Sequence, residues 1–150
     1  MDTVTHRFRD LNMIVDRVHN LFEQWKDENV FSSPLDEDTL HMLRLAIHEW
    51  VANLVQHAEF RDQEPEISIN LMPSGARVFC TIEDNSLGFD LDTSLRVREA
   101  TLESFPERGM GLLMLEACTD HLSYTQTEEG KFRLKFSVSA DQDPWLHIPF

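Results

Sequence analysis

The chain has 150 residues, so we expect a single domain over residues 1–150 with a core of ordinary size. Asp and Glu number 27 against 13 Lys and Arg, which gives a formal net charge of −14. Because this charge repels nucleic-acid backbones and anionic membranes, we expect neither among the partners.

The first part of the chain predicts two amphipathic helices. In residues 11–25 the apolar side chains recur at steps of three and four, which is the period of one helix face. This face can form part of the core or a dimer contact, and the pattern leaves both open. Ser32-Ser33-Pro34 interrupts the pattern, and a second helix is predicted over residues 38–60.

The second part of the chain predicts strands. Apolar residues alternate with polar ones on both sides of Pro73-Ser74-Gly75, which predicts an antiparallel hairpin of residues 67–71 and 78–82. Two further strands, residues 121–127 and 132–138, are predicted to join at Glu128-Glu129-Gly130. Between the two hairpins lies a long polar segment followed by a short apolar helix over residues 109–119, and the tail over residues 141–150 is predicted to be irregular.

This order of elements favours an α+β two-layer sandwich, with helices on one face of a mixed or antiparallel sheet. Cys80 and Cys118 lie in apolar stretches without paired spacing. We therefore expect two reduced core thiols in a cytoplasmic protein, with a disulfide as the alternative. The chain start lacks the apolar region of a signal peptide, and no apolar run is long enough to span a bilayer.

Three short motifs carry polar residues or glycines that are suited to ligand chemistry. In the first, Glu49, Asn53 and His57 are spaced by four and form one stripe of the second predicted helix. Taken alone, this spacing favours a solvated polar face. His48-Glu49 begins like a zinc-protease motif, but Ala52 stands where the second histidine is required, so we set zinc chemistry aside.

The second motif follows a predicted strand, where Asp84 and Gly88 lie close together. A carboxylate at a strand end can accept a hydrogen bond from an amino group, and a glycine lets a flat ligand approach the backbone. The third motif is Arg108-Gly109-Met110-Gly111-Leu112 at the start of a predicted helix, where free N–H groups suit phosphate oxygens. Taken alone, each of these two motifs favours an ordinary turn.

Taken in order, the three motifs resemble the N, G1 and G2 boxes of the GHKL ATPase/kinase superfamily, which has the Bergerat ATP-binding fold. Within it, the chain looks most like the small bacterial anti-sigma-factor serine/threonine kinases and switch-protein kinases. The first box, Glu-x-x-x-Asn-x-x-x-His, is met by Glu49, Asn53 and His57. Asp84 and Gly88 meet the second box, and Arg108-Gly109-Met110-Gly111-Leu112 meets the third, Arg-Gly-x-Gly-Leu.

The resemblance implies ATP and Mg²⁺ as cofactors and assigns a role to most of these residues. Glu49 would be the general base toward a serine or threonine hydroxyl, and Asn53 would coordinate Mg²⁺. Asp84 would accept a hydrogen bond from the adenine amino group, with Gly88 letting the base lie close. From the third box, Arg108, Gly109 and Gly111 would contact phosphate at the edge of an ATP lid over residues 90–108.

The resemblance also implies partners: an antagonist protein as substrate, a sigma factor, and a second copy of the chain in a homodimer. Two residues depart from the family pattern. Ser86 replaces the middle glycine of the second box, and Lys131 stands where the closing hairpin often has threonine. These departures favour an alternative function, a non-catalytic module of the same fold that sequesters a regulatory partner.

Overall fold

The computed structural model describes residues 4–10, 13–27, 37–60, 62–74, 77–88 and 119–139. The predicted lid, the helix predicted from residue 109 and the C-terminal tail therefore lie outside the described residues. The described part forms five strands and two helices. In chain order they are β1 (Val4–Phe8), α1 (Ile14–Asp27), α2 (Glu37–His57), β2 (Ile67–Ser74), β3 (Arg77–Asp84), β4 (Asp120–Gln126) and β5 (Phe132–Ser139).

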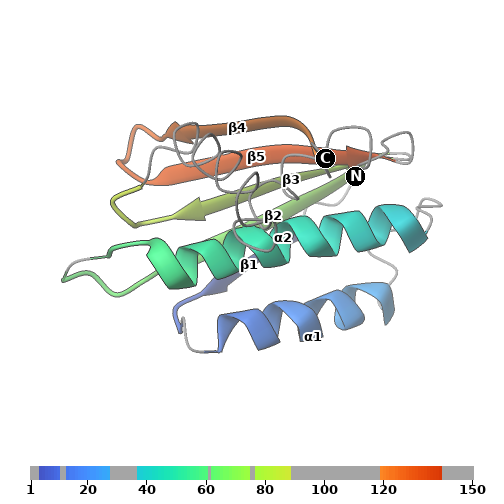
Figure 1. Ribbon diagram of the computed structural model, residues 1–150, viewed down its shortest axis with the longest axis horizontal. Coiled ribbons are helices and arrows are strands. Elements are labelled where there is room, and N and C mark those ends of the chain that lie inside the picture. The colour runs from blue at the N-terminus through green and yellow to red at the C-terminus, as the bar shows by residue number, and fades with distance from the viewer. Residues whose placement is uncertain are drawn as a thin grey trace, which may run out of the picture.

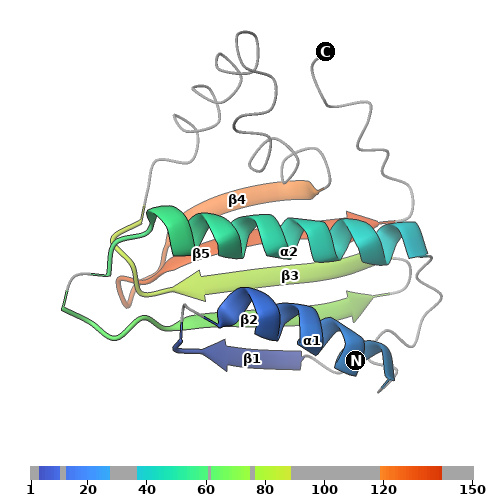
Figure 2. The same ribbon diagram turned by 60° about the horizontal axis from the view of Figure 1, so that its bottom comes forward.

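The strands form one five-stranded sheet in the order β1-β2-β3-β5-β4, and every neighbouring pair is antiparallel. Both helices lie on the same face of this sheet, side by side (Figures 1 and 2). The opposite face carries no described helix. The predicted two-layer α+β architecture is therefore confirmed, with an antiparallel sheet.

The core fills the space between the helices and the sheet. Buried inward positions on β2 and β3 alternate with more exposed outward ones, as expected for a sheet that is covered on one side, whereas on β5 the outward Ser137 and Ser139 are buried as well. Trp50 on α2 is fully buried, and most of the apolar face of α1 is buried too, including Phe22 and Trp25, while Val15 is partly buried. That face of α1 therefore belongs to the core.

Polar and aromatic contacts fix the helices to each other and to the sheet edge. Arg44 on α2 forms an ion pair of 2.9 Å with Glu23 on α1, and its guanidinium lies 5.5 Å from the centre of the Phe22 ring. Arg17 on α1 lies over the ring of Phe8 on β1, at 5.6 Å. The two layers are thus joined at the edge of the sheet that β1 forms.

Strand β1 is the element that the sequence pattern did not predict. It has only five residues, and His6 occupies one of its inward positions, so its alternation is weak. The strand forms because its backbone pairs with β2 along its whole length, and Asn70 Nδ2 donates a hydrogen bond of 2.8 Å to Thr5 Oγ1. Such tertiary pairing overrides weak local preference.

Two further expectations are tested in the described residues. Cys80 is a free, buried thiol, and burial raises the pKa of that thiol far above its usual range. Cys118 lies outside the described residues. None of the described helices combines the length and the apolar character that crossing a membrane requires.

Candidate functional site

Asp84 is a buried carboxylate at the end of β3. Its side chain is only 1% exposed, and its backbone pairs with Ile67 on one side and Phe132 on the other. Oδ1 accepts hydrogen bonds from the backbone N–H of Ser86, at 2.9 Å, and from the Ser86 hydroxyl. Oδ2 is buried and has no hydrogen-bond partner among the described residues.

The surroundings of Asp84 favour a ligand that donates a hydrogen bond. Burial raises the pKa of the carboxyl group, and the hydrogen bonds from Ser86 oppose that rise only in part. An unpartnered buried carboxylate oxygen costs free energy, so native proteins rarely keep one without a reason. An amino group on a ligand would supply the missing donor at Oδ2.

The loop after β3 is fastened to the segment that follows α2. Asn85 Nδ2 donates to the carbonyl of Glu64, and Asn85 Oδ1 accepts from the backbone N–H of Glu66, both at 2.8 Å. The Leu87 N–H donates to the carbonyl of Glu59 at 2.9 Å, only two residues beyond the end of α2. These bonds hold the Asp84 loop beside the C-terminal end of α2.

An aromatic row connects the same loop to α2 from within the protein. Phe132 stacks on Tyr124 with ring centres 5.4 Å apart, and Tyr124 meets Trp50 edge to face at 5.3 Å. Gly88 packs directly against the Phe132 ring. A Cβ added at this position would lie only 2.6 Å from two of the ring carbons. Gly88 also has a φ of +77° and donates its N–H to Ser86 Oγ at 3.1 Å.

The residues of the first motif lie on α2 beside this row. Glu49 and Asn53 are half-buried, and Asn53 lies one helical turn beyond Trp50 on the same side of the helix. His57 is the last residue of α2, and its side chain is not described. The structure therefore brings the first two motifs to one end of the molecule. The third motif, with Arg108, Gly109 and Gly111, lies outside the described residues.

The sequence pattern predicted no role in the site for two residues of this region, Ser86 and Phe132. Ser86 stood out only as a departure from a glycine pattern, yet its hydroxyl and N–H both bind Asp84. A serine two residues after an aspartate was the signal, since such side chains often bond to nearby groups in turns. Nothing in the sequence distinguishes Phe132 from any other strand residue.

Gly88→Ala is expected to destabilise the protein more than Gly130→Ala. Both glycines have positive φ, so alanine costs about 1–2 kcal/mol of stability at either position. Around Gly130 a Cβ would find open space, whereas at Gly88 it would displace Phe132 and add about 1–3 kcal/mol of overpacking. Urea unfolding of the two variants measures the difference. Equal losses of stability would contradict the packing of Phe132 on Gly88.

The comparison with protein families identifies the class of this protein. The family described as "Histidine kinase-like ATPase domain" matches residues 15–135, and the chain belongs to this family. The match spans both described motifs and the segment that holds the third. No curated protein gives a significant match to the chain.

Membership of this family supports ATP binding and an ATPase-like or kinase-like activity in general. The site is consistent with ATP binding, because the adenine amino group could donate the hydrogen bond that the buried Asp84 Oδ2 lacks among the described residues. The described residues contain no group of three or more His, Cys, Asp or Glu side chains able to hold a metal ion. This does not conflict with Mg²⁺, which proteins usually hold through one or two side chains together with nucleotide phosphates.

Proposed function

We propose that the protein is an ATP-binding regulatory protein, a serine/threonine kinase that uses MgATP to phosphorylate an antagonist protein. The observation that supports it most is the buried Asp84 carboxylate, whose Oδ2 lacks a partner among the described residues. Asp84 ends β3, and the loop that follows it is bonded through Leu87 to Glu59, two residues beyond the helix that carries Glu49 and Asn53. The proposed hydrogen-bond acceptor, Asp84, is thus on β3, and the proposed metal ligand and base, Asn53 and Glu49, are on the neighbouring α2.

In this proposal the adenine amino group donates to Asp84 Oδ2. Ser86 holds the carboxylate in place through Oδ1, so the serine that departs from the family pattern orients the acceptor. Gly88 gives the loop its left-handed turn. For the base to lie close to Gly88, the Phe132 ring that packs against this glycine would have to move aside. Arg108 and the N–H groups of Gly109 and Gly111 are proposed to contact the phosphates, on the strength of the family pattern alone.

Asn53 is proposed to hold Mg²⁺ through its side-chain oxygen. The ion, when bound, neutralises phosphate charge, which matters in a chain with a net charge of −14. Glu49 accepts the proton of a serine or threonine hydroxyl as that oxygen bonds to the γ-phosphorus and ADP leaves. Phosphoryl transfer of this kind depends mainly on positioning and charge neutralisation, with a carboxylate close to the nucleophile.

The protein partners belong to the same proposal. The likeness to anti-sigma-factor kinases favours an antagonist as substrate, a sigma factor as the protein it holds, a homodimer and a place in the bacterial cytoplasm. Incubation with labelled MgATP and a candidate antagonist tests the transfer. Absence of labelled phosphate on every cognate antagonist would contradict the kinase assignment.

Asn53→Ala is expected to abolish Mg²⁺-dependent nucleotide binding and leave the fold intact, since Asn53 is only half-buried. At a free MgATP concentration of 100 times Kd, binding stabilises the unchanged protein by about 2.7 kcal/mol, and the variant should lose that gain. Thermal unfolding with and without MgATP measures this. Gln56→Ala, an exposed position on the same helix, should respond to MgATP like the unchanged protein. Equal stabilisation of both variants would contradict the metal role of Asn53.

The alternative function is a non-catalytic module that sequesters a partner. Lys131 favours it, because it stands where the family often has a threonine that reaches the base region. Ser86 no longer favours it, since its contacts orient Asp84. The same thermal experiment separates the two functions: an unchanged protein that gains no stability from MgATP or MgADP would favour the module.

A further inference from the structure

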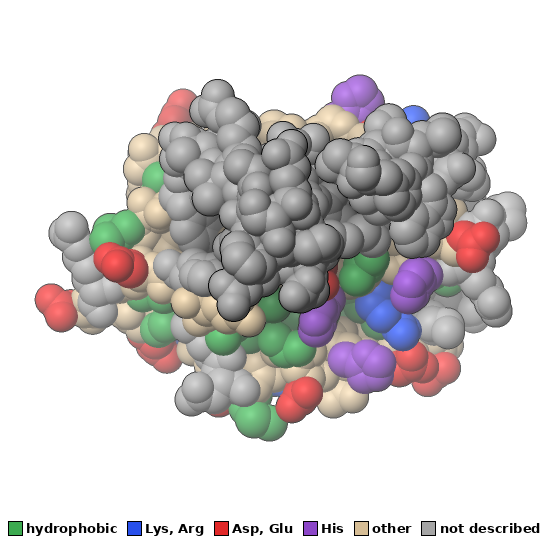
Figure 3. Space-filling view, in the orientation of Figure 1, with side chains coloured by type: hydrophobic (Ala, Val, Ile, Leu, Met, Phe, Trp, Pro, Cys, Tyr) green, Lys and Arg blue, Asp and Glu red, His purple; other side chains and the backbone are tan. Residues whose placement is uncertain are grey.

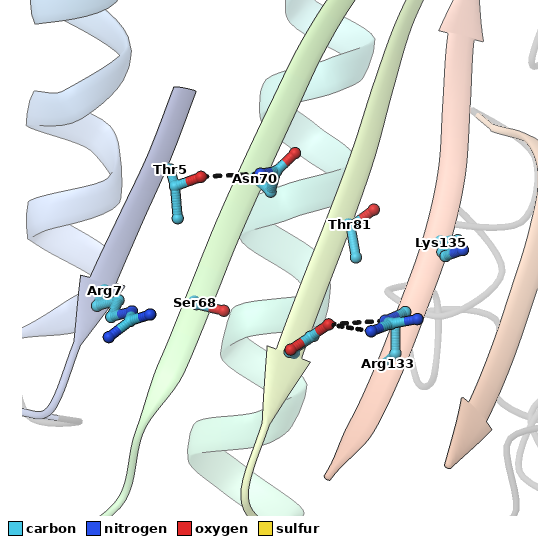
Figure 4. Close-up of a pocket in the computed structure, with 8 residues that line it drawn as sticks. Thr5, Arg7, Ser68, Asn70, Thr81, Arg133 and Lys135 are labelled. Carbon is cyan, nitrogen blue, oxygen red and sulfur yellow. Dashed lines mark hydrogen bonds and ion pairs between the residues drawn. The ribbon is translucent and has the colours of Figure 1, made fainter. Parts of the chain in front are cut away.

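The face of the sheet opposite the helices holds a shallow polar cavity of about 400 Å³. Eight side chains from four strands line it, and all of them occupy outward positions (Figure 4). They share hydrogen-bonding or charged groups and include no apolar side chain. The lining residues are Thr5 and Arg7 on β1, Ser68 and Asn70 on β2, Thr81 and Glu83 on β3, and Arg133 and Lys135 on β5.

The strand register arranges these side chains in rows across the sheet. One row runs from Arg7 through Ser68 and Glu83 to Arg133, and the row beside it ends at Lys135. Because neighbouring strands lie about 4.8 Å apart, the backbones of Arg7 and Arg133 are separated by about 14 Å. The cavity therefore presents cations at both of its sides, with hydroxyl and amide groups between them.

The charge of the cavity lining is opposite to that of the whole chain. The lining carries three cations against one carboxylate, Glu83, which Arg133 already contacts through Nη2 at 2.6 Å and Nε at 2.7 Å. Arg7 and Lys135 are exposed and have no ion-pair partner among the described residues. By contrast, acidic side chains are scattered over the helix-bearing side of the molecule (Figure 3).

An apolar pair adjoins the polar rows. Met72 and Phe79 lie directly opposite each other on β2 and β3, and they remain 40% and 39% exposed. Met72 lies two residues beyond Asn70, and Phe79 lies two residues before Thr81, so the pair faces the same side as the polar rows and is about 7 Å along the strands from the row of Asn70 and Thr81. Arg77, two residues before Phe79 on β3, faces the same side and donates a hydrogen bond of 3.4 Å to Ser137 Oγ, so the apolar pair lies between Arg77 and the cations of the cavity.

We propose that this face binds an acidic segment of a partner protein, one with carboxylates that follow an apolar anchor. Arg7 and Lys135 supply the charge complementarity, and Phe79 supplies the anchor site. A second copy of this chain is a poorer occupant, because a two-fold contact between identical faces would bring cations against cations. The rest of this acidic chain repels an acidic segment, but that repulsion is screened beyond about 8 Å at physiological ionic strength. The charge of the cavity lining therefore determines whether the segment is attracted.

The surface is separate from the proposed nucleotide site. Glu83 points outward from β3, whereas its neighbour Asp84 points toward the helices, because successive side chains of a strand face opposite sides. Failure of one proposal therefore leaves the other unaffected.

The test uses the full chain and a fluorescent peptide, Leu-Leu-Glu-Glu-Glu-Glu, with a matched peptide that has glutamine in place of every glutamate. We expect fluorescence anisotropy to detect only the acidic peptide, with an affinity that falls as salt rises. Arg7→Glu and Lys135→Glu should together raise Kd about tenfold or more, which corresponds to about 1.4 kcal/mol. His19→Glu and Asn20→Glu, two exposed positions on α1 in the other layer, should together change Kd less than about twofold.

Further variants separate a binding role from a folding role. Arg7→Lys and Lys135→Arg keep the charges and should keep the binding, whereas Phe79→Ser should weaken it. Asp84→Asn, on the other side of the sheet, should bind the peptide like the unchanged protein. Equal binding of the glutamine peptide, or unaltered affinity after both charge reversals, would overturn the proposal. So would a dimer that the reversals dissociate in a protein that does not bind the peptide, since the occupant would then be a second copy.

Discussion

The Glu49→Gln variant is expected to bind MgATP like the unchanged protein and to transfer phosphate to an antagonist about 10²–10⁴-fold more slowly. The amide has nearly the shape of the carboxylate but cannot take the proton of the attacking hydroxyl. Glu49 is half-buried on α2, so the replacement leaves no buried charge without a partner. Labelled phosphate on the antagonist measures the rate, and calorimetry with MgATP measures the binding.

The matched control is Glu59→Gln, an exposed carboxylate just beyond the end of α2. It changes the net charge by the same amount in the same neighbourhood, and transfer should continue at the original rate. A drop in both variants would mean that local charge, not proton transfer, limits the reaction. Full activity in Glu49→Gln would remove Glu49 from the chemistry.

The Asp84→Asn variant is expected to lose nucleotide affinity by about 10- to 100-fold, which corresponds to about 1.4–2.8 kcal/mol. The amide oxygen can still accept the hydrogen bonds from Ser86, but its NH₂ group replaces the acceptor Oδ2. Two donors would then face each other where the adenine amino group is proposed to lie. Calorimetric titration with MgATP measures the loss, and unchanged affinity would contradict the adenine contact.

The same variant makes a prediction about pH in the absence of nucleotide. Burial raises the pKa of Asp84, so the folded protein binds this proton more tightly than the unfolded chain does. The contribution of Asp84 to stability therefore falls as pH rises from the ordinary aspartate pKa, about 3.9, through the raised folded value. Asn cannot ionise, so the stability of the unchanged protein minus that of Asp84→Asn should decrease over this interval. A pH-independent difference would contradict the raised pKa.

The sequence predicted the fold well because its periods are strong. The apolar steps of α1 and α2 and the alternation in β2, β3 and β5 placed these elements within a few residues of their observed bounds. Strand β1 was missed because its formation depends on pairing with β2, a contact between residues far apart in the chain. Local pattern contains no information about that pairing.

The candidate site was predictable only in part. Asp84 could be located because it follows an alternating apolar strand, and Glu49 and Asn53 because they share a helical stripe. The row of Phe132, Tyr124 and Trp50 depends on the β4–β5 register and the placement of α2, which no local spacing reveals. The parts assigned to Arg108, Gly109 and Gly111 stay predictions.

The paired ends of β3 and β5 have two different neighbourhoods. Asp84 and Phe132 pair across the strands and face the helices, while Glu83 and Arg133, one residue away, pair and face outward. An occupant that changes the twist of these strand ends from one side must also move the side chains on the other. If such a movement makes one ligand change the affinity of the other, reciprocity requires that the second ligand change the affinity of the first by the same factor. The coupling would then pass through this stretch of sheet backbone.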